Sequence, residues 1–348
     1  MAIPRIFTRL SNLRPRDIFI LISAILILNS CSSVNSDSSL KSRRILLGTL
    51  VEITVLGPSD KLQEVTNSAY NEIRRIEDLA SFHKKSQLTK INQNAGISPV
   101  NVAPELVSLI QQALEVSRRT NGAFDPTIGA VAKLWNFSES DAPRLPGKDE
   151  IDQALKKVGW QKVIVVPEKH EVFLPEKGMA LDLGGIAKCY ALNQAEKMIK
   201  SLGIKSALIN AGGDIAAFGG KERGTPWRIG IQDPRDNSGI SAVLEVDAGL
   251  VFTSGDYERF FEKDGKRYHH ILDPKTGYPA SECESVTIVV PDGSRYEGFP
   301  AAIFVMGPEK GMAFVQNFKD LACLIIDSEG KFLVSPNGVS LFQLKNEN

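Results

Sequence analysis

The chain has 348 residues, of which 43% are hydrophobic and 24% are charged, a composition that excludes disordered and fibrous proteins. Lysine plus arginine and aspartate plus glutamate both number 41, and no Lys/Arg-rich run is interleaved with aromatic residues. Without such a basic stretch, the chain is not expected to bind nucleic acid.

The first 30 residues have the pattern of an export signal. Arginines precede an apolar run over residues 18–28, which is too short to cross the roughly 30 Å hydrocarbon core of a bilayer as a helix. The run ends in Leu28-Asn29-Ser30-Cys31, which resembles the lipobox of bacterial lipoproteins, with Cys31 as the lipid-bearing residue. An uncleaved membrane anchor is the alternative. In both cases we expect the domain to lie outside the cytoplasm, tethered to a membrane.

Residues 31–43 are rich in serine and have no apolar period, so they are predicted to form a flexible tether. The folded domain is then expected to occupy residues 44–348. Within it, β-branched residues over 45–56 predict a strand that ends at Gly57-Pro58. Apolar residues at steps of three and four predict a helix over 59–79.

Helices and strands alternate along the remaining chain. A helix is expected from Pro104 to Gly122, and others over 149–158, 186–202 and about 295–317, the last of them broken near Gly307. Strands are expected at 162–167, 171–174, 206–210, 227–232, 241–246, 250–253, 286–290, 322–327 and 331–334. This pattern predicts one α+β domain with a largely antiparallel sheet and flanking helices, with two intertwined lobes as the alternative.

Glycine-rich corners stand where several of these elements begin. Asp182-Leu-Gly-Gly185 precedes a helix, whose first N–H groups and dipole favour an anion, and Lys188 one turn later adds a positive charge. A second corner, Asn210-Ala-Gly-Gly-Asp214, follows an expected strand. Each corner alone is as compatible with a tight turn as with a ligand site. Together with their carboxylates, they favour a site for a nucleotide and a metal ion.

Seven motifs, read in order, resemble those of the ApbE family of FAD:protein FMN transferases. They are GTLVEI (48–53), LASFHKKSQLTKIN (79–92), GAFDPT (122–127) with a downstream LWNF (134–137), DLGGIAKCYA (182–191), INAGGD (209–214), TSGDYERFF (253–261) and HHILDPKTGYPA (269–280). The likeness covers about residues 45–310 and implies a single ApbE-like, T-fold-like domain.

The resemblance also implies an activity. Members of the family are periplasmic and often lipoproteins, which implies a location on the periplasmic side of a bacterial cell envelope. They use Mg²⁺ to move FMN from FAD to a Thr or Ser hydroxyl of an acceptor protein, such as a subunit of a membrane redox complex, and release AMP. Two alternatives use the same site: an FAD pyrophosphatase that produces FMN and AMP, and a flavin-binding lipoprotein without catalysis.

Residue roles follow from the resemblance, motif by motif. A Thr hydroxyl needs a base within hydrogen-bond reach to attack a pyrophosphate, and an imidazole has a suitable pKa. The family position of that base is His270, directly before Ile-Leu-Asp-Pro. Phe82 would stack on the isoalloxazine ring. The implied cofactor-binding residues are Leu47, Phe82, Ala123, Phe124, Asp125, Asp182, Lys188, Ile271 and Leu272.

The metal position departs from the family pattern. The resemblance places Mg²⁺ on the backbone carbonyl of Gly185 and on Glu297 and Ala301, where relatives have Asp and Thr. Glutamate is still a hard oxygen ligand, but it is one methylene longer, and Ala301 has only its carbonyl to offer. Cys189 also replaces a usual glycine. The departures at Glu297 and Ala301 concern the metal site, whereas the change at Cys189 is small enough for packing to absorb.

Overall fold

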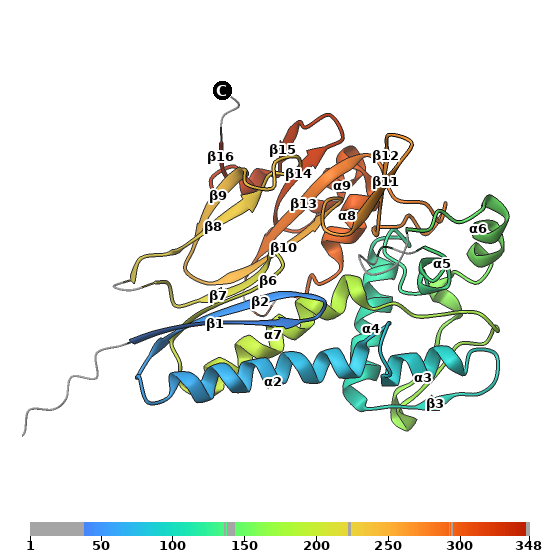
Figure 1. Ribbon diagram of the computed structural model, residues 1–348, viewed down its shortest axis with the longest axis horizontal. Helices are drawn as coiled ribbons and strands as arrows, with labels where there is room; N and C mark the ends of the chain where they lie inside the picture. Colours follow the sequence, from blue (N-terminus) through green and yellow to red (C-terminus); the bar gives the residue numbers. More distant parts are fainter. Residues whose placement is uncertain are drawn as a thin grey trace, which may run out of the picture.

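A computed structural model describes residues 38–135, 137, 143–221, 224–291, 293 and 295–345. Its central feature is an eight-stranded sheet in the order β1-β2-β6-β7-β10-β13-β14-β15, in which all neighbouring strands run antiparallel (Figure 1). The strands are β1 (Ser38–Leu46), β2 (Thr49–Gly57), β6 (Ser206–Ala211), β7 (Asp214–Phe218), β10 (Gly249–Gly255), β13 (Cys283–Val290), β14 (Ala322–Asp327) and β15 (Phe332–Val334).

Helices cover one face of this sheet. The long helices α2 (Leu62–Ala80) and α7 (Gly184–Ser201) pack side by side below the sheet in Figure 1. The buried residues of α2 include Leu62, Ile73 and Leu79, all on the face that the apolar period predicts. Helices α4 (Pro104–Arg119), α8 (Phe299–Met306) and α9 (Pro308–Val315) extend the same layer.

A second, smaller sheet packs on the other face. It contains β8 (Trp227–Gln232), β9 (Ile240–Val246) and β16 (Gln343–Leu344). Residues of β8 are alternately buried and exposed, and its buried residues Trp227, Ile229 and Ile231 pack with side chains from β7, β10, β13 and β14. The domain therefore has a helical layer, a central sheet and a partial second sheet.

Shorter elements gather at the end of the sheet where α4 lies. Trp135, Phe261 and Tyr268 pack there in a separate aromatic cluster. The elements are α3 (Gln87–Gln93), β3 (Val100–Asn101), α5 (Gly129–Ala132), α6 (Lys148–Leu155), β4 (Ile164–Val166), β5 (Glu171–Phe173), β11 (Phe260–Lys263) and β12 (Lys266–His269), and 3-10 turns lie at Trp160–Lys162, Pro167–Lys169 and, elsewhere, Pro336–Gly338.

The predicted antiparallel sheet with flanking helices is confirmed, but the prediction of its first strand was wrong. Residues 45–56 do not form one strand, because Leu47 and Gly48 adopt φ values of 55° and 69° and turn the chain into the β1–β2 hairpin. Strand β1 starts at Ser38, so residues 38–43 belong to the sheet and not to a flexible tether. Their backbone pairs with β2, and Lys41 and Arg43 both contact Glu52 across the strands. Polar edge strands of this kind lack the hydrophobic period that marks a strand.

The sequence also did not predict strand β7, the β11–β12 hairpin or the short elements α3, β3, α5 and β16. The predicted lipidation residue Cys31 and the export segment lie outside the described residues. Within the part of the chain that the structure describes, no helix combines the length and apolar character needed to cross a membrane.

Candidate active site

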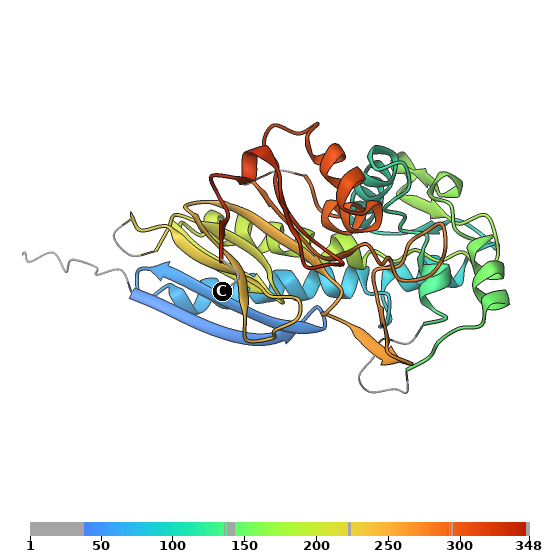
Figure 2. The same ribbon diagram turned by 90° about the horizontal axis from the view of Figure 1, so that it is seen from above.

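Two hairpin tips and the segment after β10 meet at one end of the main sheet. The N–H of Gly212, in the β6–β7 turn, donates to the carbonyl of Leu50 (3.2 Å). A Cβ on Gly212 would lie 2.5 Å from Oγ1 of Thr49, and its φ of 58° also favours glycine. A Cβ on Gly48 would lie 3.4 Å from Nη2 of Arg259. Figure 2 shows the start of this orange segment beside the tip of the blue β1–β2 hairpin.

A buried ion pair joins α7 to the β6–β7 turn. Nζ of Lys188 lies 2.9 Å from Oδ2 of Asp214, and Oδ1 of Asp214 accepts from the N–H of Thr253 (2.9 Å). Burial alone would lower the pKa of Lys188, but the charge and hydrogen bond of Asp214 raise it overall. Lys188 therefore keeps its positive charge within one turn of the α7 N-terminus, whose dipole also favours an anion.

Asp182 stands just before that helix and accepts from the N–H of its first residue, Gly184 (2.8 Å). Burial raises the pKa of Asp182, although the charges of His83 and Arg259 act in the opposite direction. The side chain nevertheless keeps accessible surface, as do Lys188 and His270. Many protein atoms thus surround side chains that still face solvent, and we refer to the region shared by Asp182, Lys188, Arg259 and His270 as the cleft.

His270 lies in this cleft at the end of β12, where its N–H donates to the carbonyl of Arg259 (3.1 Å). Loss of hydration lowers the pKa of its imidazole to about 3, with smaller contributions from the charges of Arg259, His269 and Lys188. Among the described residues, none forms a hydrogen bond with the buried Nδ1 of His270. The ring is thus neutral near pH 7 and partly exposed, while its Nδ1 is buried without a partner.

The adjacent His269 has a structural role. Its Nε2 lies 2.7 Å from the carbonyl of Ala280, and its Nδ1 accepts from the N–H of Ile271 (3.3 Å). The ring is only 4% exposed and stands edge-on to Phe304. Both ring nitrogens are used inside the protein, so the geometry selects His270, not His269, as the imidazole available to a ligand.

The turn after His270 is held by backbone hydrogen bonds. The N–H groups of Asp273 and Gly277 donate to the carbonyls of Tyr278 and Asp273 (both 2.8 Å), and that of Ala280 donates to Ile271 (3.0 Å). Nε1 of Trp135, from the LWNF segment, donates to the carbonyl of Gly277 (3.1 Å). The expected turn is therefore present, and it fixes the strand end that carries the imidazole.

The residues predicted to contact the flavin fall into two groups. Leu47 is half-buried at the β1–β2 tip, and Phe82 is half-buried directly after α2, with its ring edge-on to His83 at 5.2 Å between ring centres. Ala123 is also half-buried, and Ile271 is buried, so both border the main core. Leu272 instead packs into the separate aromatic cluster.

Asp125 is also occupied within the protein. Its carboxylate accepts from the N–H and Oγ1 of Thr127 (2.8 and 2.5 Å) and from the N–H of Trp160 (3.0 Å). Burial raises its pKa, although these hydrogen bonds act in the opposite direction. The carboxylate therefore anchors the loop after α4, and the contacts of the Asp125 and Leu272 side chains lie within the protein.

The three residues predicted for the metal lie around Phe124. A Cβ on Gly185 would lie 2.9 Å from Cε2 of Phe124 and 3.9 Å from the Cβ of Ala301. Glu297 is 4% exposed, and its Oε1 accepts from Nδ2 of Asn193 (2.5 Å). Burial raises the pKa of Glu297, while the Asn193 hydrogen bond lowers it.

These residues suit Mg²⁺ only in combination with a phosphate ligand. In the described ranges, no group of three or more His, Cys, Asp or Glu side chains is placed to hold a metal ion. The site instead offers one buried carboxylate beside backbone carbonyls. Mg²⁺ is commonly bound by one or two carboxylates plus the phosphates of a substrate, so this sparse donor set fits it.

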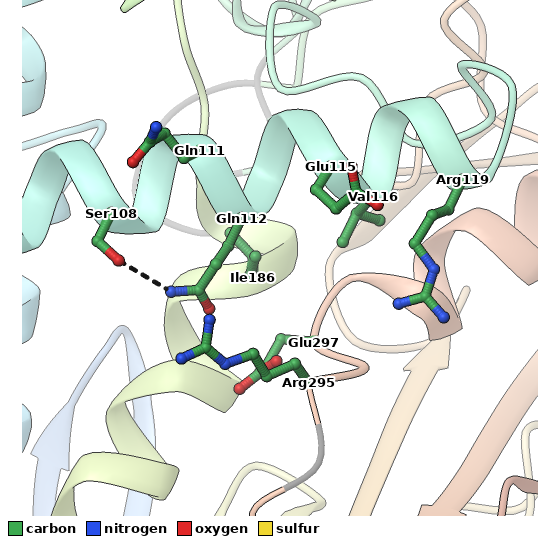
Figure 3. Close-up of a pocket in the computed structure, with 9 residues that line it drawn as sticks. All are labelled: Ser108, Gln111, Gln112, Glu115, Val116, Arg119, Ile186, Arg295 and Glu297. Carbon is green, nitrogen blue, oxygen red and sulfur yellow. Dashed lines mark hydrogen bonds between the residues drawn. The ribbon is translucent and has the colours of Figure 1, made fainter. Parts of the chain in front are cut away.

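A cavity of about 370 Å³ reaches Glu297 from the side of α4. Figure 3 shows Glu297 next to Arg295 and opposite the polar side chains that α4 presents. The cavity contains none of the residues predicted to contact the flavin. It is lined by Ser108, Gln111, Gln112, Glu115, Val116, Arg119, Ile186, Arg295 and Glu297.

Comparison with known proteins decides the family. Residues 47–325 match the model of the ApbE family. The chain belongs to this family. It is 34% identical to a FAD:protein FMN transferase of Treponema pallidum (strain Nichols) over 300 residues, which cover 81% of this chain and 83% of that protein. It is 33% identical to one from Klebsiella pneumoniae (strain 342), covering 84% and 90% of the two chains.

Solved ApbE structures share the fold. A crystal structure of the ApbE protein from Thermotoga maritima matches with a TM-score of 0.81 and 35% identity, covering 87% of this chain and 99% of that chain. The flavin transferase ApbE from Vibrio cholerae matches with a TM-score of 0.78 and 25% identity, covering 88% and 99%. The predicted single domain, with a large antiparallel sheet and flanking helices, is therefore confirmed as the ApbE fold.

Arg259 and Asn193 of this ApbE domain were absent from the residues predicted for the site, whereas Asp214 belonged to the second glycine corner but had no role assigned by the resemblance. Asp214 holds Lys188, Arg259 lies between the β1–β2 tip and His270, and Asn193 contacts Glu297. Asp214 and Arg259 stand inside the quoted motifs INAGGD and TSGDYERFF, which was a usable signal. The sequence signal for Asn193 was weak, because it is only a polar residue one turn after Cys189 on an expected helix.

Proposed function

We propose that this chain is a FAD:protein FMN transferase, which moves FMN from FAD to a Thr or Ser hydroxyl of an acceptor protein. The names of its relatives support the substrate and the transfer. The observation that carries the proposal is the neutral, partly exposed His270 ring close to the cations Lys188 and Arg259. A base beside two cations suits an attack on a diphosphate.

The reaction is a phosphoryl transfer with a defined balance of atoms. The acceptor oxygen forms a bond to the phosphorus of the FMN half, and the bond from that phosphorus to the bridging oxygen breaks. AMP leaves with the electron pair, and the hydroxyl proton passes to the imidazole of His270. Bound diphosphate adds negative charge near His270, which raises the pKa of the imidazole and makes it a stronger base.

The cations have a separate role in this scheme. Lys188 and the N-terminus of α7 bind the phosphate oxygens, and Asp214 keeps Lys188 in place. Mg²⁺, when bound, would neutralise charge on those oxygens. The Gly185 and Ala301 carbonyls and the Glu297 carboxylate are the protein groups that would hold it.

The proposal includes a location and a partner. Lipid attachment at Cys31 would hold the domain at the periplasmic side of a membrane, where an acceptor subunit of a membrane redox complex is accessible. The support is the sequence pattern of residues 1–31. Palmitate labelling of cells that express the full chain or Cys31→Ala tests it, with label expected only in the full chain.

Transfer itself is tested with the chain from residue 32, FAD, Mg²⁺ and an acceptor domain that carries a Thr. Denaturing electrophoresis should show an acceptor band that fluoresces under ultraviolet light. His270→Ala should abolish this band while FAD binding persists. His170→Asn, a change of an exposed histidine, is the matched control and should leave the band unchanged.

The same experiment separates the two alternatives. AMP released at a similar rate without the acceptor would favour a pyrophosphatase. Tight FAD binding with no AMP under any divalent cation would favour a flavin-binding protein without catalysis. Either result would contradict the transferase proposal.

A further inference from the structure

We infer that Asn193 is a positioning residue, which holds the carboxylate of Glu297 in the orientation needed to bind a divalent cation. The inference rests on the proposed function, because it concerns the metal that this function would use. It adds a residue to which the family resemblance assigned no role.

The contact joins distant parts of the chain inside the core. Asn193 lies in the third turn of α7, and Glu297 lies just before α8. Nδ2 of Asn193 donates to Oε1 of Glu297 at 2.5 Å, and the two residues are 5% and 4% exposed. Two polar groups buried together in this way have few other partners, so each determines the position of the other.

The chemistry of the donor matters. A Lys or Arg at position 193 would neutralise the carboxylate and compete with a cation for it. A neutral amide instead fixes one carboxylate oxygen and leaves the negative charge in place. Because Glu297 is one methylene longer than Asp, it has one more rotatable bond to restrain, and the hydrogen bond supplies that restraint.

Helix α7 is a suitable support for this contact. It packs along α2 below the sheet (Figure 1), and residues from Ile186 to Ile199 on its inner side are buried in the main core. The same helix carries Lys188, which pairs with Asp214, so one rigid element positions both a phosphate-binding cation and the predicted metal ligand.

The test measures metal binding rather than turnover. The probe is Mn²⁺, titrated into the chain from residue 32 with FAD present, and free Mn²⁺ is counted by electron paramagnetic resonance. Asn193→Leu keeps the side-chain volume but removes the donor. We expect its Kd for Mn²⁺ to rise by about 10- to 100-fold, the usual cost of losing a group that orients a metal ligand.

Two comparisons make the result specific. Gln112→Leu is the matched control, since Gln112 lines the cavity beside Glu297 but bonds to Ser108. Its Kd should stay within about twofold of the native value. FAD affinity measured with EDTA, by flavin fluorescence, should be the same for Asn193→Leu and the native chain. If Asn193→Leu does not fold, Asn193→Ser, whose hydroxyl is too short to reach Glu297, replaces it.

A double-mutant cycle tests whether the effect passes through Glu297. Adding Asn193→Leu to Glu297→Gln should weaken Mn²⁺ binding no further, because the carboxylate to be oriented is gone. An unchanged Kd in Asn193→Leu, an equal extra loss in the Glu297→Gln background, or no Mn²⁺ binding by the native chain would overturn the inference. Flavinylation by the native chain is measured in parallel, so that failure of the proposed function is seen separately.

Discussion

The Nζ atom of Lys188 lies 2.9 Å from Oδ2 of Asp214, and the two side chains are 25% and 3% exposed. The pair connects the first turns of α7 to the β6–β7 turn, and the second oxygen of Asp214 binds the backbone of β10 at Thr253. One carboxylate thus ties three segments of the cleft together. Removing either partner should therefore affect folding as well as ligand binding.

Lys188→Met should destabilise the domain, since it leaves the Asp214 carboxylate buried without its cation. Breaking a fully buried pair in this way costs about 3–5 kcal/mol, and because Lys188 is partly exposed we expect about 2 kcal/mol. Urea unfolding at pH 7.5 measures the loss. The double variant Lys188→Met/Asp214→Asn should recover part of it, and additive losses in the double variant would contradict the pairing.

Substitution of His269 should mainly reduce stability, and substitution of His270 should mainly reduce activity. His269→Leu leaves the Ala280 carbonyl and the Ile271 N–H without their bonds and should lower the free energy of unfolding by about 2 kcal/mol. His270→Leu should change it by less than about 1 kcal/mol and abolish transfer. Thermal unfolding and the flavinylation assay on both variants check this, and a reversal of the two effects would refute the assignment.

Stability should depend on pH through His270. Its pKa of about 3 in the folded protein is below the value of about 6.5 expected for an unfolded histidine. Between these values the unfolded chain binds a proton that the folded chain does not, so the free energy of unfolding falls as the pH falls. From pH 7 to pH 5, the native chain should lose about 1–2 kcal/mol more than His270→Gln in urea unfolding. Equal losses would show that His270 is hydrated in the folded state.

Gly185 should tolerate no side chain while Phe124 is in place. Its added Cβ would approach the Phe124 ring to 2.9 Å, so Gly185→Ala must displace the ring and should cost about 1–3 kcal/mol. Gly185→Ala/Phe124→Leu should be less unstable than the sum of the two single changes. Thermal unfolding of the four chains gives the coupling, and strict additivity would mean that the ring moves freely.

Substitutions at Ala301 test whether its departure from the family pattern weakens metal binding. Ala301→Thr adds a hydroxyl beside Gly185 and should lower the Mg²⁺ concentration for half-maximal activity by about tenfold, equivalent to about 1.4 kcal/mol. Ala301→Val has the same shape without the oxygen and serves as the control. Combining Ala301→Thr with Glu297→Asp completes the family pattern. Equal effects of Thr and Val would show that the added oxygen does not reach the cation.

Much of the fold was accessible from the sequence because its signals are local. The apolar period of α2, the proline at the start of α4 and the β-branched strands depend only on neighbouring residues. The motifs identified the family because they stand in the family's order along the chain. Each glycine motif is a local signal, since it predicts one short turn. The edge strand β1 was missed because its mostly polar residues carry no such period, and the β11–β12 hairpin because its four-residue strands are too short to show one.

Only the tertiary structure decided which groups meet. His269 and His270 are neighbours at the end of a strand, where successive side chains point to opposite faces, and the sequence does not say which face is the cleft. The contact of Asn193 with Glu297 depends on how α7 and α8 pack against the sheet. Such contacts are set by strand order and helix packing across the whole domain, whereas the periodicity of a segment reports only its own conformation.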